Sequence, residues 1–208
     1  MQSNPTVLVL GATGQMGTFF MEYLVKANLP VKAFVRKPDN FKFKAEQNVE
    51  CIQGDATDFD AVKAAMEGVD IVVSCLGNPK NKLIMETANE HIMLAAAAQK
   101  NMPKCMIISS IGLGGSSWFV KGLLSLIAGK QAINDGEKAD KIVREETDVP
   151  FTLIRPAGLT NKDETNYSLI DKSSIFFPKF MSRKAVAKFL FDNLQEDTYL
   201  NKAVLIQG

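Results

Sequence analysis

The sequence predicts an α/β fold, in which helices cover both faces of a doubly wound and mainly parallel sheet. Two observations favour it. Short apolar runs alternate with stretches of helical spacing along most of the 208 residues, and a glycine-rich turn follows the first run directly. Continuous apolar runs are typical of strands that are buried on both faces of a parallel sheet. With 46% hydrophobic residues, the chain is long enough for one domain, residues 1–208, with a sizeable core.

Seven runs rich in aliphatic and β-branched residues are predicted as strands. They span residues 6–10, 31–35, 49–53, 71–74, 104–108, 151–154 and 203–206. Between them, apolar residues recur at helical spacing and predict five helices. These span residues 15–28, 57–68, 81–101, 130–147 and 183–195. Thr57 and Ser182 are the expected N-caps of the second and the last of these helices.

Two irregular segments interrupt the alternation of strand and helix. Residues 112–129 begin with several glycines and continue as an apolar stretch, and residues 157–181 contain a second apolar cluster. Both segments follow the carboxyl ends of predicted strands, where doubly wound sheets bind their ligands. We expect them to form the walls of a substrate site, or alternatively to be buried against the core or a second subunit.

The glycine-rich turn carries the clearest chemical information. In a strand, turn and helix of this kind, the glycines permit a tight turn, a close approach of the backbone to a pyrophosphate and close packing of the helix. The free N–H groups and the helix dipole then favour an anion. The residues expected around a dinucleotide pyrophosphate are Gly11, Thr13, Gly14, Gln15, Met16 and Gly17.

The next predicted strand ends with Arg36 and Lys37, where a carboxylate would favour NAD by binding the ribose 2′-hydroxyl. The guanidinium fork and the ammonium suit a 2′-phosphate, so we expect NADP(H) to be preferred over NAD(H); a solvated basic turn is the alternative. Asp55, after the third strand, is expected to accept a hydrogen bond from the adenine amino group, with helix capping as its competitor. Leu76 and Gly77 are expected beside the cofactor ribose.

Ser109 and Ser110 end the fifth predicted strand. There a hydroxyl is placed to bond a substrate carbonyl or the nicotinamide amide, or else its own backbone. His91 is the one histidine, and its position within a helix favours a structural role, so no metal site is expected. The three cysteines lie far apart in strand-like runs, which indicates core residues of a reducing compartment, and we expect a cytoplasmic protein.

These motifs together resemble the atypical short-chain dehydrogenase/reductase group with an NAD(P)H-binding Rossmann fold, which includes the NmrA-like proteins. Within it, the chain is most similar to the flavin reductase and biliverdin reductase B type. The resemblance covers essentially the whole chain. It implies that Ser110 is the active-site serine and that Pro156, Ala157 and Gly158 form a loop beside the nicotinamide.

One position departs from the pattern of ordinary short-chain dehydrogenases, which pair a lysine with a tyrosine four residues earlier as proton donor. Lys138 occupies the lysine position, but Asn134 stands where the tyrosine would be. Lys138 is still a candidate for holding the ribose, with an ordinary exposed helix lysine as the alternative. Alcohol or ketone dehydrogenation is therefore not expected, and an epimerase or dehydratase ranks last.

Two functions follow. The first is an NADPH-dependent reductase that passes hydride to a small planar acceptor such as a flavin, a quinone or a tetrapyrrole, with Trp118, Phe119, Phe176 and Phe177 as a platform. The second is a non-catalytic NADP(H)-binding redox sensor that contacts a regulatory protein, or a second copy of the chain, through the apolar segment 118–127. A net charge of +1 and the lack of an apolar stretch of ~18 residues argue against nucleic-acid and membrane partners.

Overall fold

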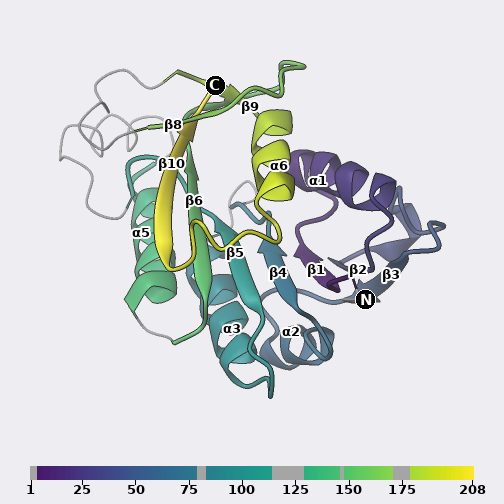
Figure 1. Cartoon of the computed structure of the whole chain (residues 1–208). Coiled ribbons are helices and arrows are strands. Elements are labelled where there is room, and N and C mark those ends of the chain that lie inside the picture. The colour runs from purple at the N-terminus through teal and green to yellow at the C-terminus, as the bar shows by residue number, and fades with distance from the viewer. Residues whose placement is uncertain (1–3, 79–82, 114–128, 146–147, 171–178) are drawn as a thin grey trace.

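The computed structural model describes residues 4–78, 83–113, 129–145, 148–170 and 179–208. Its main feature is an eight-stranded sheet in the order β3-β2-β1-β4-β5-β6-β10-β8 (Figure 1). Seven of these strands run parallel, and β8 pairs antiparallel with β10. The strands are β1 Val7–Leu10, β2 Val31–Val35, β3 Val49–Gln53, β4 Ile71–Ser74, β5 Lys104–Ile108, β6 Phe151–Pro156, β8 Ser168–Leu169 and β10 Lys202–Gln207. The predicted Rossmann-type, doubly wound architecture is confirmed.

Helices cover both faces of this sheet (Figure 1). They are α1 Gln15–Lys26, α2 Phe59–Ala65, α3 Met85–Ala97, α5 Lys130–Glu145 and α6 Arg183–Asp192. Helices α1 and α6 pack against each other on one face, whereas α3 contacts both α2 and α5 on the other. None of the helices within the described ranges is long and apolar enough to cross a membrane.

The alternation of side chains along β1 shows how one strand serves two cores. Val7 and Val9 belong to the cluster that includes α1 and α6, whereas Leu8 and Leu10 belong to the cluster that includes α2 and α3. All four side chains are buried. This is the reason that the strand reads as an uninterrupted apolar run instead of an alternating pattern.

The strand order reverses between β1 and β4, because the chain builds β2 and β3 on one side of β1 and β4 to β6 on the other. In doubly wound sheets, this reversal opens a crevice at the carboxyl ends of the strands, where ligands bind. The turn after β1 and the segments after β4 and β5 therefore lie at the position where doubly wound sheets bind their ligands.

The structure corrects several predicted elements. The N-cap of α2 is Asp58 and not Thr57: the Asp58 carboxylate accepts a hydrogen bond from the amide of Ala61 at 3.1 Å. The Thr57 hydroxyl is instead directed to Asp55 at 2.8 Å. Ser182 caps α6 as predicted, accepting from the amide of Ala185 at 2.9 Å. Helix α3 is shorter than the predicted 81–101, and Cys51 is only partly buried.

Short elements that the sequence did not predict surround the sheet. The 3-10 helix η1 spans Pro38–Asn40, and a second, two-stranded parallel sheet pairs β7 Leu159–Thr160 with β9 Met181–Ser182. This small sheet brings the chain after β6 next to the start of α6. The apolar residues Trp118, Phe119, Phe176 and Phe177, and the whole segment 118–127, lie outside the described residues.

Candidate functional site

The turn after β1 is fixed by close contacts between backbone atoms. Gly11 has a φ of +79°, and a Cβ placed on it would lie 2.8 Å from the carbonyl carbon and oxygen of Cys75, just beyond β4. A Cβ on Gly17 would lie 2.1 Å from the carbonyl oxygen of Gly11. Only glycine fits at these two positions, because the turn, the end of β4 and the first turn of α1 touch through their main chains.

The N-terminus of α1 fits an anionic group. Gly14 is the N-cap and provides no side-chain hydrogen bond, and the first turn holds no acidic residue. Within the described part of the chain, no backbone oxygen accepts from the amides of Gln15 and Met16. Unpaired amides at the positive end of a helix dipole are the groups that hold phosphate in dinucleotide sites. Thr13, Gly14 and Gln15 are exposed, whereas the Met16 side chain is buried in the core.

The end of β2 presents two exposed cations. No ion pair or hydrogen bond links the side chain of Arg36 or Lys37 to any other described residue. After β3, one carboxylate oxygen of Asp55 accepts from the amide of Thr57 at 3.0 Å and from its hydroxyl at 2.8 Å. Asp55 thus shapes the turn before α2, and the predicted adenine contact has to share its carboxylate with that turn.

A pocket of about 200 Å³ lies beyond the ends of β4 and β5, between α3 and α5. It brings together Leu76, Gly77, Ser109 and Ser110, four of the residues expected from the sequence. Its other walls are mostly apolar, with Met85, Ile108, Leu113 and Ile133 among them. Convergent polar groups in an apolar hollow at the carboxyl edge of the sheet are the usual form of a small-molecule site.

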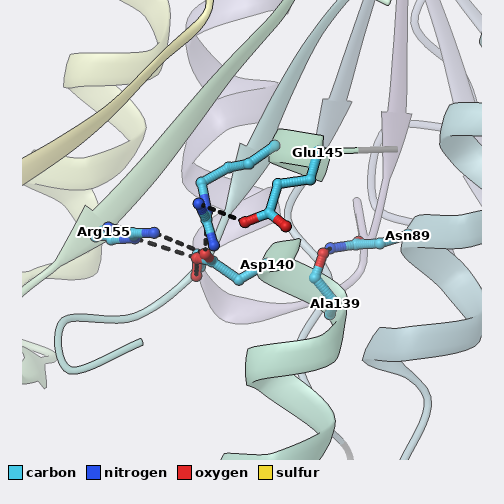
Figure 2. A network of polar contacts seen from close by, with 7 residues as sticks. Asn89, Ala139, Asp140, Glu145 and Arg155 are labelled. Atoms are coloured by element: carbon cyan, nitrogen blue, oxygen red, sulfur yellow. Dashed lines mark hydrogen bonds and ion pairs between the residues drawn. The ribbon is translucent and has the colours of Figure 1, made fainter. Parts of the chain in front are cut away.

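One wall of this pocket is formed by a buried ionic network centred on Asp140 of α5, shown in Figure 2. One oxygen of the Asp140 carboxylate accepts from Ser109 Oγ at 2.9 Å and from Arg155 Nε at 3.1 Å. The other accepts from Arg155 Nη2 at 2.6 Å and from Arg144 Nε at 2.9 Å. The Asp140 side chain is fully buried and that of Arg155 is 6% exposed. The network therefore joins β5, β6 and α5. It also orients the hydroxyl of Ser109, which donates its proton to Asp140.

A second carboxylate of α5 joins the two helices that flank the pocket. Asp135 accepts from the amides of Met85 and Glu86, both at 3.2 Å, and from Asn78 Nδ2 at 2.8 Å. It thereby satisfies the first amides of α3, which has no side-chain cap of its own. Asp135 and Asp140 position the site, and neither was predicted. The signal for them was two acids on the apolar stripe of an amphipathic helix, beside Ala139 and Val143.

The remaining residues that the sequence singled out do not line this pocket. Lys138 does not line it: the Lys138 ammonium pairs with Glu86 at 3.0 Å, and 64% of its side chain is exposed. Asn134 is also exposed. Pro156 is the last residue of β6, Ala157 and Gly158 follow it, and none of the three lines the pocket. The ring of Phe180, itself 73% exposed, lies against Gly158. His91 packs against Phe59, with ring centroids 5.7 Å apart, in a structural position.

Residues 11–197 match the model of a family described as NAD(P)H-binding. A divinyl chlorophyllide a 8-vinyl-reductase of Arabidopsis thaliana is 24% identical over 97% of this chain, which spans only about half, 53%, of that protein.

Two solved structures share the fold. ChuY, an anaerobillin reductase from Escherichia coli O157:H7, has a TM-score of 0.80 at 21% identity, covering 97% of this chain and 96% of that one. A short-chain dehydrogenase/reductase from Veillonella parvula in complex with NADP has a TM-score of 0.81 at 19% identity, covering 98% and 94%. The turn after β1, the reversal of strand order and the match over most of the length lead to one conclusion: the chain belongs to the family described as NAD(P)H-binding, and it has the Rossmann-type fold.

Proposed function

We propose that this protein is an NADPH-dependent reductase that passes hydride to a planar, conjugated acceptor such as a flavin, a tetrapyrrole or a quinone. One observation carries the proposal. An uncapped helix N-terminus suited to a pyrophosphate and a mostly apolar pocket with two serines lie along the same carboxyl edge of the sheet. The turn after β1 would hold the pyrophosphate, and the pocket would receive the reacting ring.

The preference for NADP(H) is supported by the exposed cations at the end of β2. A 2′-phosphate at this position would meet Arg36 and Lys37, which have no described carboxylate partner to compete for them. The fork of Arg36 matches phosphate oxygens, and Lys37 adds a point charge. The three free cysteines suit a reducing compartment, so the cytoplasm is the proposed location.

Among the described residues that line the pocket there is no tyrosine and no lysine, the pair that classical carbonyl reduction uses. Asp140 is the one titratable residue among its described lining residues, and both of its oxygens are already engaged. When bound, the nicotinamide cofactor supplies a hydride, that is, two electrons and one proton; the second proton of the reduced acceptor comes from solvent. Conjugated acceptors tolerate this because their negative charge is delocalised. Two relatives are named for reactions on such molecules, a chlorophyllide and an anaerobillin.

The test follows NADPH absorbance and fluorescence while FMN, biliverdin and menadione are added in turn. Faster oxidation than in the enzyme-free control with one of these acceptors supports the reductase. Binding of NADPH without faster oxidation by any acceptor contradicts the reductase and favours the redox sensor. The shortage of proton donors among the described pocket residues is also compatible with a sensor.

The cofactor preference is tested by charge reversal at the end of β2. The substitution Arg36→Glu is expected to weaken NADPH binding by about 10-fold or more and to leave NADH binding nearly unchanged. Lys100→Glu is the matched control. Lys100 is an exposed cation between α3 and β5, so it lies at the amino ends of the strands and not at the carboxyl ends, where Arg36 lies. Equal loss of NADPH and NADH binding in the Arg36 variant would contradict the proposed role.

A further inference from the structure

The segment that follows β4 is held in place from behind the pocket wall. Leu76, Gly77 and Asn78 of this segment line the pocket, whereas Asp135 of α5, which binds Asn78, does not. We propose, on the basis of the reductase function above, that Asp135 is a positioning residue for the nicotinamide half of the cofactor. Through Asn78, it fixes the backbone of Gly77 in the conformation that receives this half.

The Asp135 carboxylate connects both ends of the chain between β4 and α3. Its Oδ2 accepts from Asn78 Nδ2 at 2.8 Å and from the amide of Met85 at 3.2 Å. Its Oδ1 accepts from the amide of Glu86 at 3.2 Å. Asn78 Oδ1 in turn accepts from the amide of Ile84 at 2.9 Å. The chain that leaves β4 and the chain that enters α3 are thereby bound to each other and to α5.

This arrangement depends on α5. Asp135 is 7% exposed, and the groups that donate to it in the described part of the chain are neutral N–H groups. Its charge lies at the first turn of α3, where the positive end of the helix dipole favours a carboxylate. A helix is usually capped by the residue just before it, but α3 has no such side-chain cap and takes its cap from a residue 50 positions away. The segment after β4 and the start of α3 therefore keep their geometry only while α5 is in place.

Gly77 is the residue of this segment that is best suited to contact a ligand. It is exposed, a Cβ added to it would meet nothing within 4 Å, and no group in the described ranges accepts a hydrogen bond from its amide. A glycine loses more conformational freedom on becoming ordered than any other residue. Because the Asp135 contact fixes the neighbouring Asn78, part of this order exists before the ligand arrives. Each residue ordered in advance is worth about 10-fold in affinity.

The position of Gly77 in the sheet points to the nicotinamide half. Gly77 follows β4, whereas Arg36 follows β2, and these two strands flank β1 on opposite sides. A dinucleotide binds across the point where the strand order reverses, so its two halves lie on opposite sides of that point. Since Arg36 is proposed to bind the 2′-phosphate of the adenosine half, the nicotinamide half falls on the side of β4.

The experiment compares two ligands by calorimetric titration: NADPH, and adenosine 2′,5′-bisphosphate, which lacks the nicotinamide half. The variant Asn78→Asp keeps the shape of the side chain and its acceptor for Ile84, but it replaces the donor to Asp135 with a second carboxylate. We expect it to bind NADPH about 10-fold more weakly, and the bisphosphate as tightly as the wild type does. An unchanged affinity for NADPH, or an equal loss for both ligands, would overturn the inference.

A second substitution separates positioning from direct contact between residue 78 and the cofactor. In the double variant Asn78→Asp/Asp135→Asn, the amide at position 135 can donate to the carboxylate at position 78, so the contact is restored with its polarity reversed. Most of the lost affinity for NADPH should return. If none returns, residue 78 acts on the ligand itself, and Asp135 is not a positioning residue.

Glu86→Gln is the matched control, because it removes another polar contact between the same two helices. These contacts include the ion pair of Glu86 with Lys138 at 3.0 Å, and the hydrogen bond from Asn89 Nδ2 to the carbonyl of Ala139 at 3.3 Å (Figure 2). The substitution leaves the Asn78 contact and the backbone amide of Glu86 in place, so both affinities should stay as in the wild type. A loss of NADPH affinity as large as in Asn78→Asp would contradict a specific role of Asp135.

Hydrogen exchange of the wild type tests the same role without a variant. The amides of residues 77–78 and 84–86 should become better protected when NADPH binds, and much less so when the bisphosphate binds. Equal protection by the two ligands, or no protection by either, would overturn the inference. If titration and exchange both behave as expected but no acceptor speeds NADPH oxidation, the reductase function fails while the role of Asp135 stands.

Discussion

At the carboxyl end of β1 the chain is held by contacts between backbone atoms, whereas beyond β5 and β6 it is held by contacts between buried side chains. Gly11, Gly17 and the carbonyl of Cys75 meet through their main chains. On the other side of the pocket, Ser109, Arg144 and Arg155 converge on the carboxylate of Asp140.

This difference has a physical consequence for each region. A turn packed through its backbone tolerates no added atom, but it leaves its amides free for a ligand. A buried ionic network keeps its geometry only while every member is present, because a charge left alone in the interior is strongly destabilising. The first region is therefore sensitive to side chains that are added, and the second to side chains that are removed.

The largest effect is expected from Asp140→Ala. This substitution leaves the guanidinium of Arg155, 6% exposed, without its carboxylate, and should lower the free energy of unfolding by about 3–5 kcal/mol. Urea unfolding measures it. Glu145→Ala is the control, because Glu145 is 47% exposed and pairs with Arg144 at the surface end of the same network, so its loss should cost under about 1 kcal/mol. Similar losses in both variants would show that the burial of Asp140 does not account for the loss in the free energy of unfolding.

The next effect is expected from Gly17→Ala. The new Cβ would lie 2.1 Å from the carbonyl oxygen of Gly11, so the helix or the turn has to move, at a cost of about 1–3 kcal/mol. We also expect weaker NADPH binding, measured by fluorescence titration, because the amides of the turn shift. Gly77→Ala serves as the stability control, since nothing lies within 4 Å of its added Cβ. Unchanged stability and binding in Gly17→Ala would refute the account of a backbone-packed turn.

The same comparison explains how much the sequence predicted. The turn after β1 was found because its three glycines lie within seven residues, at the spacing of a dinucleotide-binding turn, although its contact with Cys75 comes from a distant part of the chain. The long strands and helices were found because their burial repeats with a regular period. Within the sheet, even the double burial of β1 is visible as a continuous apolar run.

The network around Asp140 was not predicted, because two of its partners, Ser109 and Arg155, come from other elements of the chain. Ser109 is 31 residues away, Arg155 is 15 away, and the Asn89 contact with Ala139 spans 50. The two-residue strands β7, β8 and β9 are too short to show a period. The cap of α2 was misassigned because Thr57 and Asp58 are both good caps, and the hydrogen bond of Thr57 to Asp55 decides between them.

The smallest expected effect is a change in the rates of thiol labelling. This measurement compares the two regions within one molecule. Burial raises the pKa of Cys75 and of Cys105 to about 12, and it raises the pKa of the partly exposed Cys51 as well. The thiolate is the reactive form, so iodoacetamide at pH 8 should label Cys51 first and the other two only when the protein opens.

In Gly17→Ala we expect Cys75 to gain reactivity over Cys105, by about 5-fold for each 1 kcal/mol of local destabilisation, because Cys75 touches the strained turn directly. In Asp140→Ala this preference should be absent, since the network lies beyond β5 and β6 and not beside Cys75. Peptide mass spectrometry reads the three sites separately. If Cys75 and Cys105 gain equally in Gly17→Ala, the turn and the network open as one unit, and the distinction between the two regions is lost.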